Sequence, residues 1–148
     1  MRKLLSTSVL TCAFLLSATS LRAQQNTIMI QVLDGYTGVS IARHPVFVSI
    51  GATPAEAKAR KNILSLWTEQ RGILMLPLTN PTGWIQLWTA DMHACEPHPE
   101  ANAFSLAQIS TKGLQTPNKC SSLSTQIGPG HFIVYMRELT PAERAATK

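Results

Sequence analysis

The sequence predicts an all-β protein, a β-sandwich of about seven strands with short helical insertions. Six or seven short segments rich in β-branched and aromatic residues are separated by turns containing glycine, proline, asparagine or aspartate. Consecutive segments are not separated by a helical stretch of about 10–15 residues, which a parallel α/β sheet would need. These features favour stacked sheets over a parallel α/β fold.

The expected strands alternate with strong turn signals. They are residues 27–33, 45–50, 63–68, 73–77, 84–90 and 131–137, and residues 123–127 are a further candidate. In the second strand Val46, Val48 and Ile50 should share one face, because successive side chains of a strand point to opposite sides. Residues 34–38 supply a turn with two glycines that can adopt positive φ.

Three short helices are expected from their capping sequences rather than from their length. At the first, Thr53 is a capping residue followed by proline, and Glu56 can cap back toward the helix start. Glu56 and Arg60 are then four residues apart and should pair on the helix surface. Similar capping sequences begin at Ser105 and Thr140.

The N-terminus has the features of a cleavable secretory signal peptide covering residues 1–23. Arg2 and Lys3 precede an apolar run that ends near residue 16, and a more polar stretch leads to a cleavage site between Ala23 and Gln24. The apolar run is shorter than the roughly 20 residues that span a bilayer, which argues against an uncleaved anchor. The expected working protein is one domain, residues 24–148, secreted or periplasmic and associated with the cell envelope, without a membrane span.

The charge balance gives no support to nucleic-acid binding. Loss of Arg2, Lys3 and Arg22 with the leader would leave ten basic and eight acidic residues, so the formal net charge falls from +5 to +2. A nucleic-acid-binding protein needs a basic surface that neutralises phosphates. The one basic cluster, residues 58–61, is expected on the solvated side of a short helical loop.

Two cysteines remain after the leader, Cys95 and Cys120. Thiols oxidise outside the cytoplasm, so the two are expected to form a disulfide, and only one pairing exists. A closed loop of about 25 residues would stabilise the fold by roughly 3 to 4 kcal/mol in the chain-entropy model.

The turns and the C-terminal half carry a family resemblance. The residues that carry it are 34–38, 46–50, 68–77, Phe104-Ser105, Ile109, Gly113, 117–120, Pro129-Gly130 and Arg137. In these residues the chain resembles the carboxypeptidase regulatory-like, or transthyretin-like, β-sandwich, and more narrowly small secreted proteins of that type from acidobacteria. The resemblance implies an immunoglobulin-like or transthyretin-like sandwich and an accessory module, and it implies no particular activity.

Trp84 and Trp88 are the strongest candidates for a binding site. They share one face of the expected strand with Gln86, about 13 Å apart at a rise of roughly 3.3 Å per residue. That spacing suits a flat aromatic platform for a polysaccharide. Tryptophans also pack under loops and over sandwich edges, so exposure of both rings would separate the two interpretations.

Neither a catalytic nor a metal site is predicted. His93, Cys95 and His98 are close in sequence, but a cysteine in a disulfide offers no thiolate to a metal. Serines such as Ser105 and Ser121 lie in no nucleophile motif with histidine and an acid. The sequence therefore predicts a non-catalytic module without a cofactor that contacts a partner protein or an envelope component. A carbohydrate-binding module is the first alternative, and a metal-dependent enzyme is the second.

Overall fold

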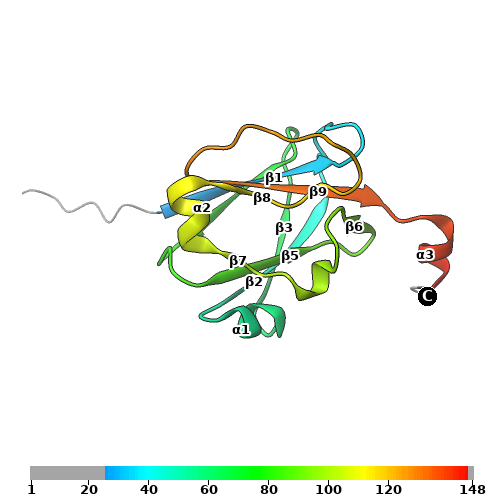
Figure 1. The fold of residues 1–148 in the computed structure, drawn as a ribbon. Helices are drawn as coiled ribbons and strands as arrows, with labels where there is room; N and C mark the ends of the chain where they lie inside the picture. Colours follow the sequence, from blue (N-terminus) through cyan, green and yellow to red (C-terminus); the bar gives the residue numbers. More distant parts are fainter. Residues whose placement is uncertain (1–25, 147–148) are drawn as a thin grey trace, which may run out of the picture.

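The computed structural model describes residues 26–146, which form two β-sheets around a shared core (Figure 1). Sheet A has the strand order β4-β1-β9-β6, and β8 also pairs with β9; sheet B has the order β3-β2-β5-β7. The strands of sheet A are β1 (Asn26–Asp34), β4 (Ile73–Leu78), β6 (Met92–Ala94), β8 (Leu114–Gln115) and β9 (His131–Glu138). Those of sheet B are β2 (Pro45–Gly51), β3 (Ile63–Trp67), β5 (Trp84–Trp88) and β7 (Phe104–Ser105).

The predicted all-β sandwich is confirmed at this level of detail. The expected leader, residues 1–23, and its cleavage point between Ala23 and Gln24 lie outside the described residues. The six principal strands lie where the sequence pattern placed them, with ends that differ by one or two residues.

Sheet A is organised around β1. This strand pairs antiparallel with β4 and parallel with β9, so the first and last strands of the described chain lie side by side. Ile28, Ile30 and Val32 alternate along β1 and are buried in the core. Because β1 and β9 are more than a hundred residues apart in sequence, this sheet forms only when both ends of the chain are in place.

Sheet B contributes the opposing half of the core. Val46 and Val48 of β2 and Ile85 and Leu87 of β5 are buried against residues of sheet A such as Phe132. The predicted shared face of Val46 and Val48 is therefore confirmed. Residues of β5 that alternate with Ile85 and Leu87 consequently lie on the outer face of sheet B.

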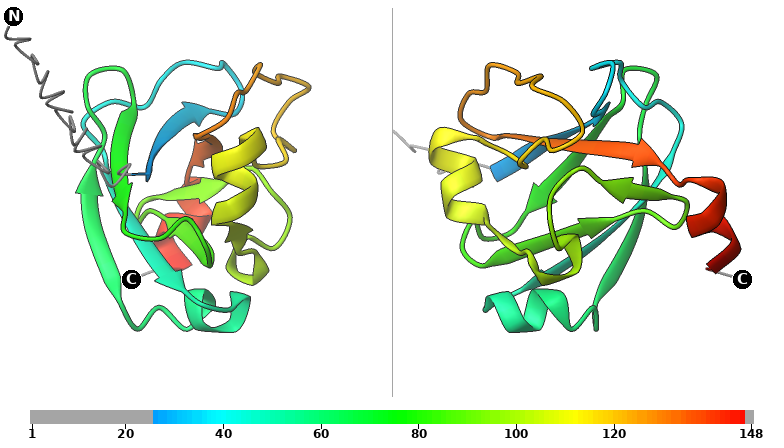
Figure 2. Two further views of the ribbon diagram at one scale, coloured as in Figure 1. Left: turned by 90° about the vertical axis from the view of Figure 1, so that its left-hand side faces the viewer. Right: turned by 45° about the vertical axis from the view of Figure 1, so that its right-hand side comes forward.

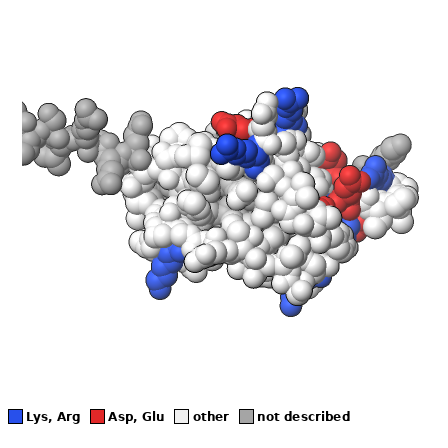
Figure 3. All heavy atoms as spheres, turned by 90° about the horizontal axis from the view of Figure 1, so that it is seen from above, with Lys and Arg blue, Asp and Glu red and all other residues white. Residues whose placement is uncertain are grey.

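The outer faces of the two sheets are covered differently (Figure 2). The helix α1 (Pro54–Lys58) lies on sheet B, where Ala57 is fully buried against β2 and β5. On sheet A, the segment 116–130 lies over Leu33, Ile133 and Tyr135 and forms a second, smaller apolar cluster with them. Seen from that side, charged side chains lie in scattered groups rather than in a continuous stripe (Figure 3).

Three predicted capping interactions are present in the helices. The side-chain oxygens of Thr53, Ser105 and Thr140 accept hydrogen bonds from backbone N–H groups three residues later, at 3.2, 3.3 and 3.3 Å. The helices α2 (Leu106–Lys112) and α3 (Pro141–Ala146) follow two of these caps, and a 3-10 turn, η1 (Pro99–Ala101), lies between β6 and β7. Within residues 26–146, every helix is too short or too polar to cross a membrane.

The predicted disulfide between Cys95 and Cys120 is confirmed. It joins the end of β6 to the segment 116–130, and the loop that it closes contains α2, as expected from the sequence. The bond lies on the outer side of sheet A, in the smaller apolar cluster, and not between the sheets. It therefore holds the cover of one sheet in place.

Two expectations about strands are wrong. Residues 123–127 form no strand; they belong instead to the segment that covers sheet A, with Ile127 packed against the apolar cluster that contains Tyr135. The strand predicted at residues 84–90 ends at Trp88, because Thr89 turns the chain by bonding through its hydroxyl to the backbone of Met92.

Candidate functional site

Three aromatic side chains cross the outer face of sheet B, one from each of three neighbouring strands. Phe47 of β2 lies opposite Trp88 of β5, and their rings are stacked with centroids 5.9 Å apart. Trp67 of β3 lies opposite Pro45, which shares the outer face with Phe47. Trp67, Phe47 and Trp88 therefore form a diagonal line, called the aromatic row below.

The outer end of the aromatic row is highly exposed. Trp67 is 63% exposed, whereas tryptophan side chains in folded domains are highly buried on average. Its strand, β3, is the last in sheet B, so one edge of it has no strand partner within residues 26–146. Ile63 and Leu64 on the same strand are also exposed, at 52% and 45%. An apolar edge strand of this kind is a surface to which another chain can add.

The inner end of the aromatic row is fixed by Arg60. Its guanidinium carbon lies 4.1 Å from the centre of the Trp88 ring, a cation–π contact. Arg60 Nε donates to Gln86 Oε1 at 3.0 Å, and Gln86 Nε2 donates to the carbonyl oxygen of Glu100 at 3.1 Å. Gln86 lies on the outer face of sheet B but is only 1% exposed, so this chain of bonds anchors the guanidinium to a covered part of β5.

The position of Arg60 differs from both expectations for it. The sequence placed it on a solvated helix face paired with Glu56, but α1 ends at Lys58 and Arg60 has a φ of 52° in the left-handed region. The chain therefore leaves the helix before the i,i+4 position is reached. Glu56 instead accepts a hydrogen bond from the backbone N–H of Ala52 at 2.9 Å.

A cavity of about 240 Å³ opens beside Trp88 and Arg60. Its walls come from the ends of β5, β6 and β9 and from η1. The apolar side chains are Leu87, Ala90, Met92, Ala94, Pro99, Met136 and Leu139, and the polar residues at it are Arg60, Thr89, His93 and Glu100. The aromatic row thus ends at an apolar hollow with a cation at its rim.

The two tryptophans of the predicted platform lie on one face of β5, as expected, but both are half-buried. Arg60 occupies one face of the Trp88 ring. Trp84 lies between Gly51 of β2 and Ser105 of β7. The most exposed ring on this face is instead Trp67, which sequence reasoning missed together with Phe47. The alternation in residues 45–50 already placed Phe47 on the side opposite Val48, but the pairing register with β3 was needed to bring Trp67 beside it.

The histidines do not gather around a metal-binding centre. Cys95 is bonded to Cys120, while His93 and His98 have exposed side chains. Within the part of the chain that the structure describes, three or more histidine, cysteine, aspartate or glutamate side chains nowhere group as metal ligands would. Ser105 and Ser121 serve the backbone, as a helix cap and as a donor to the carbonyl of Gly35 at 2.6 Å.

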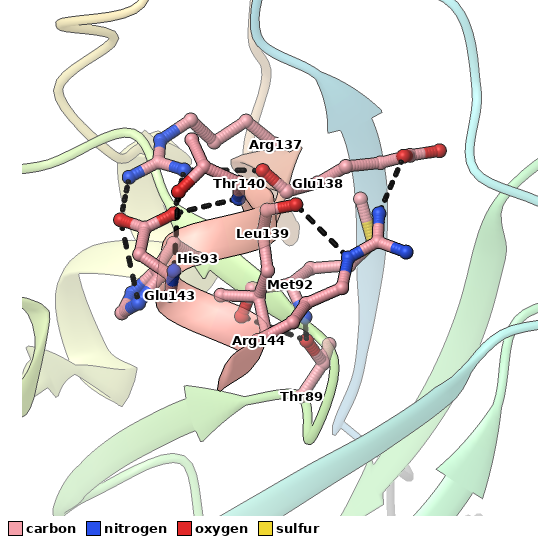
Figure 4. Close-up of polar contacts among 9 residues, drawn as sticks. All are labelled: Thr89, Met92, His93, Arg137, Glu138, Leu139, Thr140, Glu143 and Arg144. Carbon is pink, nitrogen blue, oxygen red and sulfur yellow. Dashed lines mark hydrogen bonds and ion pairs between the residues drawn. The ribbon is translucent and has the colours of Figure 1, made fainter. Parts of the chain in front are cut away.

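A polar cluster fixes α3 beside the cavity (Figure 4). Arg137 donates to both carboxylate oxygens of Glu143, at 2.8 and 2.7 Å, and the backbone N–H of Thr140 donates to Glu143 Oε2 at 2.7 Å. The hydrogen bonds from Arg137 and then from Thr140 hold the pKa of the Glu143 carboxyl well below its usual range. His93 Nε2 lies 4.0 Å from the same carboxylate. The cluster lies next to Leu139, which lines the cavity and whose carbonyl oxygen accepts a hydrogen bond from Arg144 Nε at 3.0 Å.

A buried carboxyl supports the opposite wall. Glu96 is 8% exposed and accepts a hydrogen bond from Asn102 at 2.9 Å across the turn that contains η1. Burial raises the pKa of Glu96 from 4.5 to about 7; the bond from Asn102 opposes the rise, and the Glu100 carboxylate adds to it. At neutral pH the Glu96 carboxyl is therefore close to the midpoint of its titration.

The wild-type protein is expected to lose stability when Glu96 ionises, and replacement Glu96→Gln should remove this pH dependence of the free energy of unfolding. Because the folded-state pKa lies above 4.5, the stabilising contribution is complete below pH 4.5 and is lost as the pH rises through 7. For the wild type we expect the free energy of unfolding to fall by about 1–2 kcal/mol over this pH range. Solvent screening makes this fall smaller than the full pKa shift would give. Urea denaturation from pH 4 to 8.5 measures it. Glu69→Gln, at an exposed carboxyl, should keep the wild-type profile, and parallel profiles for wild type and Glu96→Gln would contradict the assignment.

Comparison with family models, with curated protein sequences and with solved structures finds no match to this chain.

Proposed function

We propose that the protein is an exported, non-catalytic binding module that contacts a partner protein through the aromatic row and the adjoining edge of β3. The observation that carries the proposal is Trp67, which is 63% exposed at the end of a row built from three strands. Large aromatic side chains on a rigid sheet are the residues that dominate protein–protein binding energies. The apolar edge of β3 beside them has no strand partner among the residues that the structure describes, and it suits addition of a strand from a partner protein.

We propose that the protein is secreted or periplasmic and acts at the cell envelope. The N-terminal leader features and the disulfide support this location, because disulfides persist in oxidising compartments. We also propose that the sandwich is of the carboxypeptidase regulatory-like or transthyretin-like type, immunoglobulin-like in the wider sense. Its support is the family resemblance of the turns together with two stacked sheets of short strands.

Replacement Trp67→Ala is expected to weaken binding to the partner by at least about tenfold, because a buried interface tryptophan typically contributes 2 kcal/mol or more. The assay measures retention of the purified protein on cell-envelope fractions of its own host at increasing protein concentration. Met75→Ala is the matched control, since Met75 is 49% exposed but lies on β4 of sheet A.

Protease treatment of the envelope and competition with soluble oligosaccharides distinguish a protein partner from a carbohydrate ligand. A protein partner is removed by protease and is indifferent to sugars. Competition by oligosaccharides, with loss of binding in Trp84→Ala and Trp88→Ala, would instead establish the carbohydrate-binding module. Equal retention of wild type, Trp67→Ala and Met75→Ala would contradict the aromatic row as the binding surface.

A further inference from the structure

The cavity beside Trp88 is large enough for a small organic molecule. Its volume is about 240 Å³; an apolar cavity of about 150 Å³ is enough to hold benzene. Leu87, Met92, Met136 and Leu139 give it apolar walls from β5, β6 and the end of β9. Figure 4 shows Met92 and Leu139 close together beside the polar cluster of α3. A ligand would place an aromatic ring or a short aliphatic chain here.

Arg60 is held over the cavity rim in one orientation. The contact of its guanidinium with the Trp88 ring and the bond from Nε to Gln86 fix the plane of the group. Among the interactions of the described residues, Nε is the only nitrogen of this guanidinium with a hydrogen-bond acceptor. The two terminal nitrogens are thus available as a pair of parallel donors, the geometry that suits a carboxylate.

The backbone around the rim carries conformational strain. Arg60 and His98 are two of the three non-glycine residues with positive φ among residues 26–146, at 52° and 54°. One carries the cation, and the other precedes η1, which supplies Pro99 and Glu100 to the cavity. Such conformations cost about 1–3 kcal/mol each and persist where the surroundings impose them, often at ligand sites.

The acidic groups near the rim have other partners, so the positive charge of Arg60 is available to an anionic ligand. Glu100 is the one acidic residue of the lining, and its carboxylate lies 3.6 Å from His98 Nδ1. Of the other nearby carboxyl groups, Glu143 is bonded to Arg137, and Glu96 accepts a hydrogen bond from Asn102. His93 lies at the rim and contributes positive charge only when protonated. The rim therefore favours an anion, with Glu100 moderating its affinity.

We propose that this cavity binds a small monocarboxylic acid with an apolar body, the body in the hollow and the carboxylate on the guanidinium of Arg60. Two parallel N–H···O bonds would form at the rim, and apolar surface of the ligand would leave water. The cavity shares Trp88 with the aromatic row, but Trp67 and Phe47 are not part of the lining. The ligand site therefore does not need the row to have a protein partner.

Isothermal titration of the full folded protein tests the site with phenylacetate and octanoate, against the neutral analogues 2-phenylethanol and 1-octanol. Saturable binding of at least one acid is expected, at least about tenfold tighter than its neutral analogue. Arg60→Gln should weaken the acid at least tenfold and leave the alcohol unchanged. Arg43→Gln is the matched control, because Arg43 also has a positive φ, 54°, but does not line the cavity.

A second variant tests the hollow separately from the cation. Ala94→Phe places a ring in the cavity while leaving Arg60 in position, and it should remove binding of the acids and their neutral analogues alike. Trp67→Ala should bind the acids as wild type does, so failure of this site and failure of the aromatic row are distinguishable. The proposal is overturned by the absence of saturable binding at millimolar acid, or by equal affinities in wild type and Arg60→Gln.

Discussion

Replacement of both Cys95 and Cys120 by alanine is expected to lower the free energy of unfolding by about 3 kcal/mol and the melting temperature by about 10 °C. The disulfide joins residues 25 positions apart and fixes the segment 116–130 on sheet A. Without it the unfolded chain gains conformational freedom, and the cover of Tyr135 and Ile133 is held only by apolar contacts and hydrogen bonds.

Urea denaturation of the oxidised wild type and the double alanine variant measures this difference directly. Reduction of the wild type should give nearly the same loss, which controls for the removed side-chain atoms. A stability within about 0.5 kcal/mol of the oxidised wild type would contradict the structural role of the bond.

Replacement Gly35→Ala is expected to destabilise the oxidised protein by about 1–3 kcal/mol. An added Cβ at this position would collide with Cys95 Sγ and lie 3.0 Å from Asn118 Oδ1. The neighbourhood cannot yield easily, because the carbonyl oxygen of Gly35 accepts bonds from Asn118 and Ser121 at 2.9 and 2.6 Å. Gly35 is therefore required for space beside the disulfide.

A double-mutant cycle isolates that reason. In the variant with alanine at positions 95 and 120 the colliding sulfur is absent, so Gly35→Ala should cost much less than in the wild type. Gly128→Ala serves as the control, because a Cβ there meets no atom within 4 Å. An equal cost of Gly35→Ala in both backgrounds would mean that the disulfide is not what excludes the side chain.

The strands that could be predicted are those long enough to show alternation. Residues 45–51 place Val46 and Val48 inward in the sequence pattern and in the structure alike. The strands β7 and β8 have two residues each and β6 has three, too few for a period to appear. Their existence depends on pairing with β5 and β9, which is a property of the tertiary fold.

The disulfide could be predicted because only two cysteines follow the leader that the sequence predicts, but its place in the fold could not. Cysteine count fixes the pairing and says nothing about which layer of the fold holds the bond. The structure puts it on the outer side of sheet A, where Gly35 and the segment 116–130 make room for it. The caps at Thr53, Ser105 and Thr140 could be predicted together with their place, because a helix cap depends only on about four consecutive residues.

Only part of the candidate site could be predicted from the sequence. Trp88 was identified from the alternation in β5, whereas Trp67 joins it through the pairing of β2 with β3 and β5. Arg60 was assigned to a helix face by a local rule that fails once the backbone turns left-handed at that residue. The cation–π contact with Trp88 then depends on residues 28 positions apart, which no local pattern reports.

Site-specific photocrosslinking in living cells of the native host tests most directly whether the outer face of sheet B is the binding surface. A photoreactive residue replaces Trp67 of β3 or, in a matched strain, Met75 of β4, and crosslinked products of the protein are followed on denaturing gels. Position 67 should give a discrete, protease-sensitive adduct that position 75 does not. An adduct from position 75 with none from position 67 would contradict the assignment and place the partner on sheet A.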